Sequence, residues 1–342
     1  MPLVSYLHRT AAGSHLTAEQ AYQAMSALLD GSAPEAQIAG FLVALRIKGE
    51  TAAELAGFAR AMRERMLFVD AGPDVIDTAG TGGDNAGTFN ISTVAALVMA
   101  GAGARVAKHG NRSISSAAGS ADVLEALGVR IAPSGEASSA AEAASAVREI
   151  GIGFLFAPAL HPAMKHAQPV RRALKMRTAF NLLGPLCNPA RAQFQLIGAP
   201  SPEAAKLMAE ALAQLGTRRS FVVHGHDGLD EITTTGATDV FEVTPEGVTK
   251  HLWTPADFGV PRTVASSLLG GDSARNAQIA REILSGAEGP ARDIVLVNAA
   301  AGLLAAGIAP TLHAGVGMAA EAIDSGAARG KLELLRKRFP VE

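Results

Sequence analysis

A short apolar run that stops at a cluster of glycines constrains this chain more than any other stretch. Val75 and Ile76 begin the run, which leads through D-T-A into G-T-G-G-D at 80–84. Apolar residues followed by glycines predict a strand that ends in a loop. The sequence N-I-S-T at 90–93 then opens an apolar helix. A glycine-rich turn between a strand and a helix directs backbone N–H groups and the positive end of the helix dipole into one space, which suits a phosphate.

A second strand-to-loop transition follows shortly afterwards. Residues 105–107 predict a strand that delivers Lys108 and His109, and the polar sequence G-N-R-S-I-S-S follows it. Two adjacent loops of this kind would face one anion. Neither is a standard nucleotide motif, because G-T-G-G-D lacks the G-K-[ST] ending of a P-loop and the G-A-G at 101–103 follows a helix. Ordinary turns of an α/β domain are the alternative for either loop taken alone.

Length and composition exclude several classes of protein. The chain has 342 residues, 48% of them hydrophobic, and a net charge of −2, which fits one large α/β core with a smaller domain and gives no basic field for nucleic acid. A signal peptide is not expected, and the longest apolar tract, 294–309, is interrupted by Asn298 and is short for a bilayer-spanning helix. Cys187 is the only cysteine, so a reducing, cytoplasmic location is expected.

The N-terminal part is predicted to be helical. In a capping box, a hydroxyl and a carboxylate or amide satisfy the free N–H groups at a helix start. Three pairs match this pattern: Thr17 with Gln20, Ser32 with Glu35, and Thr51 with Glu54. An apolar stripe follows each pair. Helices this short bury little apolar surface against one another, so they are expected to pack on a partner chain or on the main domain.

From residue 75 onward, predicted strands and helices alternate. Further strands are expected at 153–156, 193–197, 220–224 and 240–243, and helices at 121–127, 138–149, 202–215, 274–284 and 293–305. Such alternation predicts an α/β fold, with a small N-terminal helical domain and a large domain around a mostly parallel sheet. The ligand site is expected at the carboxyl ends of the strands, where Gly80, His109 and Asp227 fall.

Two later clusters carry charge. The sequence H-P-A-M-K-H-A-Q-P-V-R-R-A-L-K at 161–175 favours a solvated basic helix face, in which Pro169 could aim one arginine inward. Its histidines lack metal-ligand spacing. The sequence H-G-H-D-G-L-D-E places the adjacent Asp230 and Glu231 after a strand. Acidic pairs on loops are usually solvated, but a phosphate loop in the same sheet favours a Mg²⁺ that carries substrate phosphates.

Together, these motifs resemble those of the anthranilate phosphoribosyltransferase family, which joins anthranilate to phosphoribosyl pyrophosphate in tryptophan biosynthesis. G-T-G-G-D, N-I-S-T, K-H-G-N-R-S, V-R-R, R-T-A-F-N-L-L-G-P-L-C-N-P and G-L-D-E stand in the family's order over nearly the whole chain. The resemblance implies a small dimerising domain, built from 1–69 and a segment near 158–181, and a large domain at 70–342. It implies a Mg²⁺ cofactor and a homodimer, without nucleic-acid or membrane partners.

The resemblance also assigns site residues by motif. Phosphoribosyl pyrophosphate would be held by Gly80, Gly83, Asp84, Thr88, Asn90, Ile91, Ser92, Thr93, Lys108, His109, Gly110, Asn111, Arg112, Ser113, Ile114, Ser115, Ser116 and Ser120. Anthranilate would meet Gly80, His109, Asn111 and Arg171, and magnesium would be served by Ser92, Asp230 and Glu231. Lys108 would act electrostatically on the departing charge. No general base is assigned, because the aromatic amine of anthranilate is neutral at pH 7.

Two other functions share parts of this pattern. A pyrimidine nucleoside phosphorylase would have the same fold but an S-G-R-G-L-type second loop in place of K-H-G-N-R-S. A non-enzymatic, nucleic-acid-binding relative would show degraded phosphate loops and a basic face. The intact loops and the slightly acidic charge favour the transferase.

Overall fold

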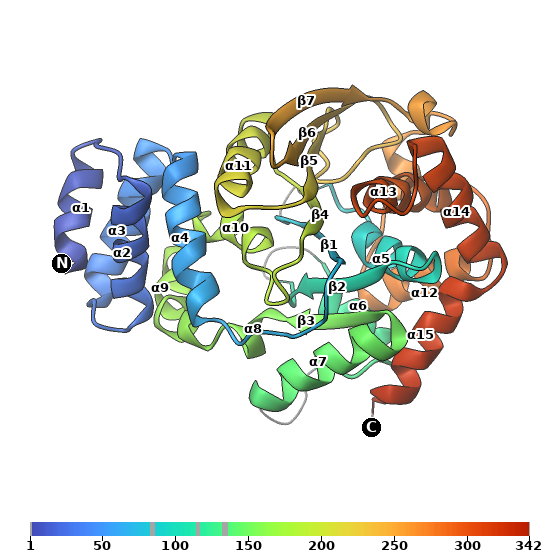
Figure 1. Ribbon diagram of the computed structural model, residues 1–342, viewed down its shortest axis with the longest axis horizontal. Helices are drawn as coiled ribbons and strands as arrows, with labels where there is room; N and C mark the ends of the chain where they lie inside the picture. Colours follow the sequence, from blue (N-terminus) through green and yellow to red (C-terminus); the bar gives the residue numbers. More distant parts are fainter. Residues whose placement is uncertain (1, 83–85, 114–116, 132–135, 342) are drawn as a thin grey trace.

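The computed structural model describes residues 2–82, 86–113, 117–131 and 136–341, with 136–138 described by their backbone only. Four helices precede the first strand and form a group of their own (Figure 1). They are α1 (Leu3–Ala11), α2 (Ala18–Leu29), α3 (Glu35–Lys48) and α4 (Ala52–Arg65). The sequence prediction lacks α1, although its buried Leu3 and Tyr6 have helical spacing.

Two of the three predicted capping boxes are confirmed. The hydroxyls of Thr17 and Thr51 accept hydrogen bonds from the backbone N–H groups of Gln20 and Glu54. In return, the side chains of Gln20 and Glu54 accept from the backbone N–H groups of the two threonines. The third prediction is wrong, because α3 begins after Pro34 without a side-chain cap and the Ser32 hydroxyl donates to Ala27 O instead. Because α3 starts at Glu35 with Pro34 at its N-cap position, Ser32 stands two residues too early in the chain to cap it.

A seven-stranded sheet forms the centre of the larger part, in the order β3-β2-β1-β4-β5-β6-β7. The strands are β1 (Val75–Gly80), β2 (Arg105–Gly110), β3 (Ile152–Phe156), β4 (Phe194–Gly198), β5 (Arg219–Gly225), β6 (Thr238–Thr244) and β7 (Gly247–Trp253). Neighbours from β3 to β5 are parallel, and β6 and β7 are added antiparallel. The mostly parallel sheet is therefore confirmed, and β7 is the strand that the sequence prediction lacks.

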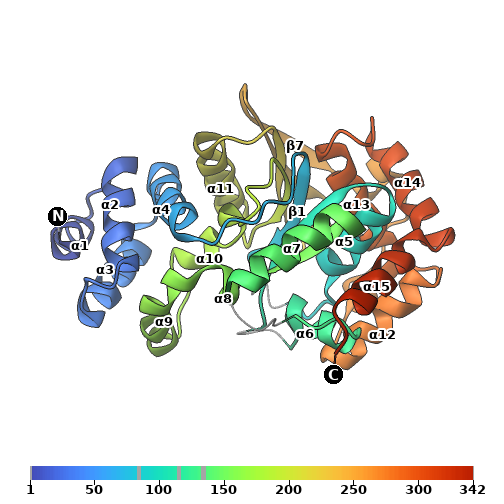
Figure 2. The same ribbon diagram turned by 60° about the horizontal axis from the view of Figure 1, so that its bottom comes forward.

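Helices cover both faces of the sheet (Figures 1 and 2). α5 (Ile91–Gly101) and α13 (Pro290–Ala305) pack on one face, and α7 (Glu136–Ile150) and α11 (Pro202–Leu215) on the other. α12 (Ser273–Leu284), α14 (Leu312–Asp324) and α15 (Ala327–Arg338) add a layer outside α5 and α13, and α14 and α15 are absent from the sequence prediction. Among the described residues, no helix has the length and apolarity to cross a membrane.

A connected run of short helices joins the N-terminal helices to the sheet. It comprises α8 (Ala157–Leu160), the 3₁₀ turn Pro162–His166, α9 (Gln168–Leu174), α10 (Phe180–Leu183) and the 3₁₀ turn Pro185–Cys187. The run contacts α2, α3 and α4. One apolar cluster extends from these helices through Leu183 and Cys187 to Val222 of the sheet. The N-terminal helices are thus anchored to the face of the sheet that α11 covers.

Gly57 marks the closest approach of α2 and α4. A Cβ atom at this position would lie 2.2 Å from Ala18 O and 2.8 Å from Ala21 Cβ. Glycine in a helix interior is otherwise unfavourable, by ~1 kcal/mol relative to alanine. Helix contact rather than local propensity therefore accounts for the glycine.

Gly57→Ala should lower the free energy of unfolding by about 1–3 kcal/mol, because the added methyl group must push α2 away from α4. Urea denaturation followed by circular dichroism measures the change. Gly317→Ala is the matched control, since Gly317 lies inside α14 with no neighbour near its Cβ position. It should raise the same free energy by about 0.5–1 kcal/mol. Equal stabilisation by both variants would contradict the close contact.

Candidate active site

Loops that leave the carboxyl ends of β1 and β5 meet at one edge of the sheet. Gly82 N donates to Asp230 Oδ2 at 2.7 Å, and Ser92 N donates to Glu231 Oε1 at 3.2 Å. Both carboxylate side chains are buried. The structure thus brings the first glycine loop, the start of α5 and the acid pair into one site, although the acid pair follows the loop by more than a hundred residues.

Two glycines make room for the Asp230 loop. Gly80 and Gly198 are register partners at the ends of β1 and β4. A Cβ atom on Gly80 would lie 2.4 Å from Asp230 Oδ2, and one on Gly198 would lie 1.5 Å from Asp230 O. The resemblance assigns Gly80 to the substrates, whereas in the structure the Asp230 carboxylate occupies the space that a side chain at Gly80 would need. Gly82 has a φ of +71°, which suits glycine and turns its N–H toward that carboxylate.

β1 and β2 separate as they approach the site. Their ladder register covers only the first two residue pairs. Beyond it, His109 N donates to Asp77 Oδ1 at 3.0 Å, and Lys108 Nζ donates to Thr78 O at 2.7 Å. Side chains therefore replace ladder bonds between the strands, and backbone groups that would otherwise lack partners are satisfied.

Asp77 and Asn188 are site-supporting residues that sequence analysis lacks. Asn188 Nδ2 donates to Ala107 O at 2.8 Å, in the same opening between β1 and β2. Burial raises the pKa of Asp77 to about 6, against the opposing effects of Asn188 and Lys108. The available signal was an acidic residue inside the apolar sequence V-I-D-T-A-G, since a buried carboxylate needs partners.

Lys108 connects β2 to the start of α5. Besides Thr78 O, its Nζ donates to Ser92 Oγ at 3.2 Å. Burial lowers the pKa of Lys108, while the nearby carboxylates Asp77 and Glu231 raise it. Lys108 was expected directly after a strand at 105–107, as a phosphoribosyl pyrophosphate ligand, whereas the structure places it inside β2, buried and bonded to Thr78 and Ser92.

A histidine pair lies beside these groups. His109 Nε2 and His161 Nε2 are 3.2 Å apart, and His109 Nδ1 is 3.2 Å from Gly184 O. Because a carbonyl only accepts, His109 carries its proton on Nδ1 and accepts from His161 at Nε2. Burial lowers the pKa of His109 to about 3 and that of His161 to about 4, so both rings are neutral at pH 7. Sequence analysis assigns His161 no role, because its contact with His109 depends on the fold.

Arg171 lies on α9, within the run of short helices that also carries His161 and Gly184, the two residues that contact His109. Its guanidinium carbon is 5.1 Å from the centroid of the Phe180 ring, and burial lowers its pKa. Arg172 is exposed. Of the two arginines in V-R-R, Arg171 is the one turned inward.

Asp122, at the start of α6 (Ser120–Ala126), organises the loop after β2. Its Oδ2 accepts from Ser113 N at 3.1 Å and from Gly119 N at 2.9 Å. Arg112 is exposed, and its guanidinium bonds Glu125 at 2.6 Å and Asp122 at 3.0 Å. The charge of Arg112, a predicted phosphate ligand, is therefore engaged within this loop.

The loops after β1 and β2 are joined directly. Asn90 Nδ2 donates to Ala118 O at 3.1 Å, and Ser120 Oγ donates to Asn111 O at 3.2 Å. A Cβ atom on Gly110 would lie 2.3 Å from Ser120 Oγ, so this glycine allows the loop to close.

Some residues that were expected to bind phosphoribosyl pyrophosphate are engaged elsewhere in the structure or lie outside its described part. The side chains of Ile91 and Thr93 are buried, and Ile91 belongs to the main apolar core, so its side chain does not face the site. Thr88 forms an isolated antiparallel bridge with Leu269. Gly83, Asp84, Ile114, Ser115 and Ser116 lie outside the described residues.

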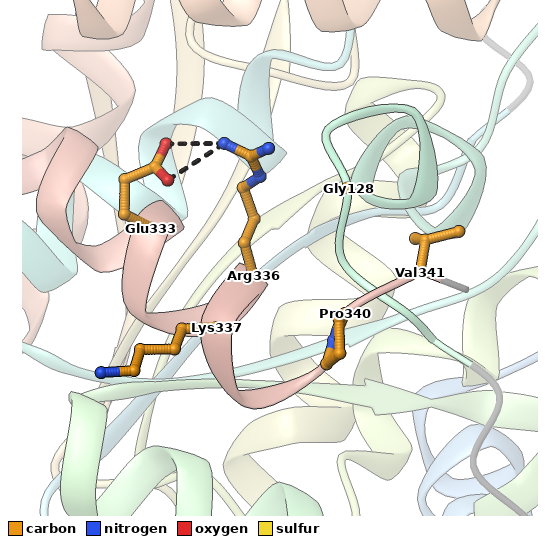
Figure 3. Close-up of a pocket in the computed structure, with 6 residues that line it drawn as sticks. All are labelled: Gly128, Glu333, Arg336, Lys337, Pro340 and Val341. Carbon is orange, nitrogen blue, oxygen red and sulfur yellow. Dashed lines mark hydrogen bonds and ion pairs between the residues drawn. The ribbon is translucent and has the colours of Figure 1, made fainter.

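A surface hollow near the C-terminus is separate from these loops. It has a volume of about 370 Å³ and is lined by Gly128, Glu333, Arg336, Lys337, Pro340 and Val341. Figure 3 shows both carboxylate oxygens of Glu333 bonded to Arg336, at 3.0 Å each. Because its lining comes from α15 and the segments beside it, this hollow is not a candidate active site.

Comparison with known proteins matches two family models. The helical-bundle domain of a glycosyl transferase family matches residues 4–66, and its a/b domain matches residues 72–329. Among solved structures, anthranilate phosphoribosyltransferase from Thermus thermophilus is 46% identical with a TM-score of 0.89, covering 97% of this chain and 98% of that one. The Saccharomyces cerevisiae enzyme in complex with PRPP and Mg is 29% identical with a TM-score of 0.87, covering 98% and 97%.

A curated relative extends the similarity. Anthranilate phosphoribosyltransferase from Solibacter usitatus is 59% identical over 98% of this chain and 98% of its own length. Sequence and fold agree with these relatives over 97–98% of the chain. The chain therefore belongs to the anthranilate phosphoribosyltransferase family.

Proposed function

We propose that this protein transfers the phosphoribosyl group of phosphoribosyl pyrophosphate to the amine of anthranilate. The products are N-(5-phosphoribosyl)anthranilate and pyrophosphate, in tryptophan biosynthesis. The observation that carries the proposal is the convergence of the glycine loop, the K-H-G-N-R-S loop and the acid pair at one sheet edge, in a chain that belongs to this family. A nucleoside phosphorylase is disfavoured because K-H-G-N-R-S stands in the second loop.

Phosphoribosyl pyrophosphate is held by the loops after β1 and β2. The start of α5 at Ser92 and the loop from Asn111 to Ser113 place hydroxyl and side-chain amide groups beside the positive end of the helix dipole. Lys108 supplies a buried positive charge behind them. Gly83, Asp84, Ser115 and Ser116 complete this set in the proposal on their sequence motifs alone.

Asp230, Glu231 and Ser92 fit a magnesium site. All three offer hard oxygen atoms, and Ser92 N already bonds the Glu231 carboxylate. The described residues contain no cluster of three or more His, Cys, Asp or Glu side chains, which fits an ion held by one or two carboxylates and by substrate phosphates. When bound, Mg²⁺ would neutralise the charge of the pyrophosphate group.

Anthranilate binds beside the histidine pair. Arg171 is the candidate for its carboxylate, because a guanidinium can form a bidentate pair with a carboxylate. In the proposal, His109 and Asn111, at and just after the end of β2, meet anthranilate together with Arg171. The neutral aromatic amine attacks the anomeric carbon as pyrophosphate leaves, and the proton then passes to solvent. Fixed loops make positioning the main contribution to the rate.

The N-terminal helices form the dimer interface in this proposal, together with the segment near 158–181, in a cytoplasmic enzyme. Ile47, in the last turn of α3, is 82% exposed and is the apolar side chain assigned to the interface in this proposal. Sedimentation equilibrium should give twice the chain mass at micromolar concentration. Ile47→Asp should shift the protein toward monomer, whereas the same change at the exposed Leu334 of α15 should not. A wild-type monomer would contradict the proposal.

The fluorescence of anthranilate should fall over time when the wild-type protein is supplied with both phosphoribosyl pyrophosphate and Mg²⁺. The double variant Asp230→Asn, Glu231→Gln should lose Mg²⁺-dependent turnover and keep its circular dichroism spectrum, because amides have the same shape but bind Mg²⁺ weakly. Asp257→Asn, in the 3₁₀ turn Pro255–Phe258, is the control and should keep full turnover. Unchanged activity of the double variant at limiting Mg²⁺ would remove the pair from the site.

Arg171→Ala should raise the Michaelis constant for anthranilate and leave phosphoribosyl pyrophosphate binding nearly unchanged. Loss of a charged hydrogen bond costs ~1.5–3 kcal/mol, which corresponds to roughly a ten- to hundredfold change. Steady-state kinetics with each substrate varied, plus calorimetric titration of phosphoribosyl pyrophosphate, measure both effects. Arg172→Ala, at the exposed neighbouring arginine, is the control. If Arg171→Ala instead weakened phosphoribosyl pyrophosphate alone, Arg172 or Arg177 would become the carboxylate candidate.

A further inference from the structure

Two buried asparagines stand behind the site, on helices that supply none of its assigned ligands. Asn298 lies in the middle of α13 and is fully buried, and Asn276 on α12 is 3% exposed. A buried amide is costly unless its hydrogen-bonding groups are satisfied. Each asparagine bonds one of the site loops, Asn298 through Ile232 and Asn276 through Asn90.

Asn298 clamps the backbone that follows the acid pair. Its Oδ1 accepts from Ile232 N at 3.0 Å, and its Nδ2 donates to Ile232 O at 2.9 Å. Nδ2 also donates to Ile294 O, one turn earlier in α13, at 2.9 Å. One side chain thus pairs with both backbone groups of Ile232 and ties them to a helix of the core.

The clamp fixes the carboxylates because Ile232 directly follows Glu231. With the backbone of Ile232 held, the preceding Asp230 and Glu231 have little freedom to change direction. Their oxygens meet Gly82 N and Ser92 N. Asn298 therefore sets where the acid pair stands relative to the first loop.

Asn276 supports the other side of the site through a chain of hydrogen bonds. Its Oδ1 accepts from Gly271 N at 2.8 Å, and its Nδ2 donates to Asn90 Oδ1 at 2.9 Å. Asn90 in turn donates to Ala118 O at 3.1 Å. A Cβ atom on Gly270 would lie 2.5 Å from Asn276 Oδ1, so the glycine leaves room for this amide. α12 thereby orients the side chain that joins the loops after β1 and β2.

We propose that Asn298 and Asn276 are positioning residues, Asn298 for the acid pair that serves magnesium and Asn276 for the two loops that hold phosphoribosyl pyrophosphate. The proposal rests on the proposed function for the identity of the two ligands. The hydrogen bonds that define the two roles are separate, because Asn298 bonds the loop after β5 and Asn276 bonds the loop after β1. Loss of each asparagine therefore has its own signature.

The kinetic test compares Asn298→Ala with Asn276→Ala, so that each variant controls for the other. Leaving a buried backbone group unpaired costs ~1–3 kcal/mol, or about five- to 150-fold. Asn298→Ala should raise the Mg²⁺ concentration for half-maximal activity at least fivefold, with the Michaelis constant for phosphoribosyl pyrophosphate at saturating Mg²⁺ changed less than twofold. Asn276→Ala should raise the Michaelis constant for phosphoribosyl pyrophosphate at least fivefold and change the Mg²⁺ concentration for half-maximal activity less than twofold. Gly57→Ala, which destabilises the fold far from the site, should move neither constant.

Two measurements do not depend on turnover. Hydrogen exchange in the ligand-free protein should accelerate in the 226–238 region for Asn298→Ala and remain at the wild-type rate there for Asn276→Ala. In calorimetric titrations without Mg²⁺, the affinity for phosphoribosyl pyrophosphate should fall at least fivefold in Asn276→Ala and stay at the wild-type value in Asn298→Ala. If either alanine variant fails to fold, the corresponding serine variant, Asn298→Ser or Asn276→Ser, takes its place, because a serine hydroxyl is too short to reach Ile232 or Asn90.

Equal shifts of both constants in both variants, or a lower melting temperature with neither constant moved, would overturn the positioning roles. Unchanged exchange at 226–238 in Asn298→Ala would overturn the clamp by itself. Absence of phosphoribosyl transfer by the wild type would instead refute the proposed function, and the exchange measurement would still decide the clamp.

Discussion

The buried ammonium of Lys108 is the interaction on which the arrangement of this site depends. A lone buried charge costs several kcal/mol, and partners must offset that cost. Here Thr78 O and Ser92 Oγ accept its hydrogen bonds, and Asp77 and Glu231 supply negative charge nearby. These partners come from β1, α5 and the loop after β5. One lysine thus requires three separate elements to end in the same place.

The same requirement explains why the sheet opens there. If β1 and β2 remained paired along their whole length, a regular ladder would fill the space that Asp77 and Asn188 occupy. Instead, their side chains bond His109 N and Ala107 O. The loop after β2 repeats this pattern through Asp122, and the loop after β5 repeats it through Asn298. Side-chain-to-backbone bonds let a loop keep an irregular path without leaving buried polar groups unpaired.

Sequence patterns predicted the parts of this structure that local physics decides. The caps at Thr17 and Thr51 need only residues within one helical turn, and the alternation after residue 75 follows from apolar spacing. The prediction at Ser32 failed because α3 begins only at Glu35, with Pro34 rather than Ser32 at its N-cap position. The second loop was singled out because it is a polar loop at a second strand end, and the acid pair because a phosphate loop in the same sheet favours a nearby Mg²⁺. The resemblance of the motifs to one family then joined them into a single site.

Contacts between distant segments could not be predicted in the same way. His161 lies 52 residues from its partner His109, and nothing in its own neighbourhood indicates the contact. Gly80 was predicted to line a phosphate loop from its sequence context. In the structure, its lack of a side chain makes room for the Asp230 carboxylate, which the sequence did not indicate. Asn298 did have a signal, an amide within an apolar helix, but its partner became clear only in the fold.

Charge within the site gives the strongest physical reason for a divalent cation. The Lys108 ammonium lies near the carboxylates of Asp77 and Glu231, and the same site holds the Asp230 carboxylate, which accepts the N–H of Gly82. A pyrophosphate group that entered the glycine loop would therefore meet more negative than positive charge. Even with Asp77 protonated, which its raised pKa favours below about pH 6, two carboxylates face one ammonium. Extra positive charge at the acid pair would remove this repulsion and let carboxylates and phosphates share one space.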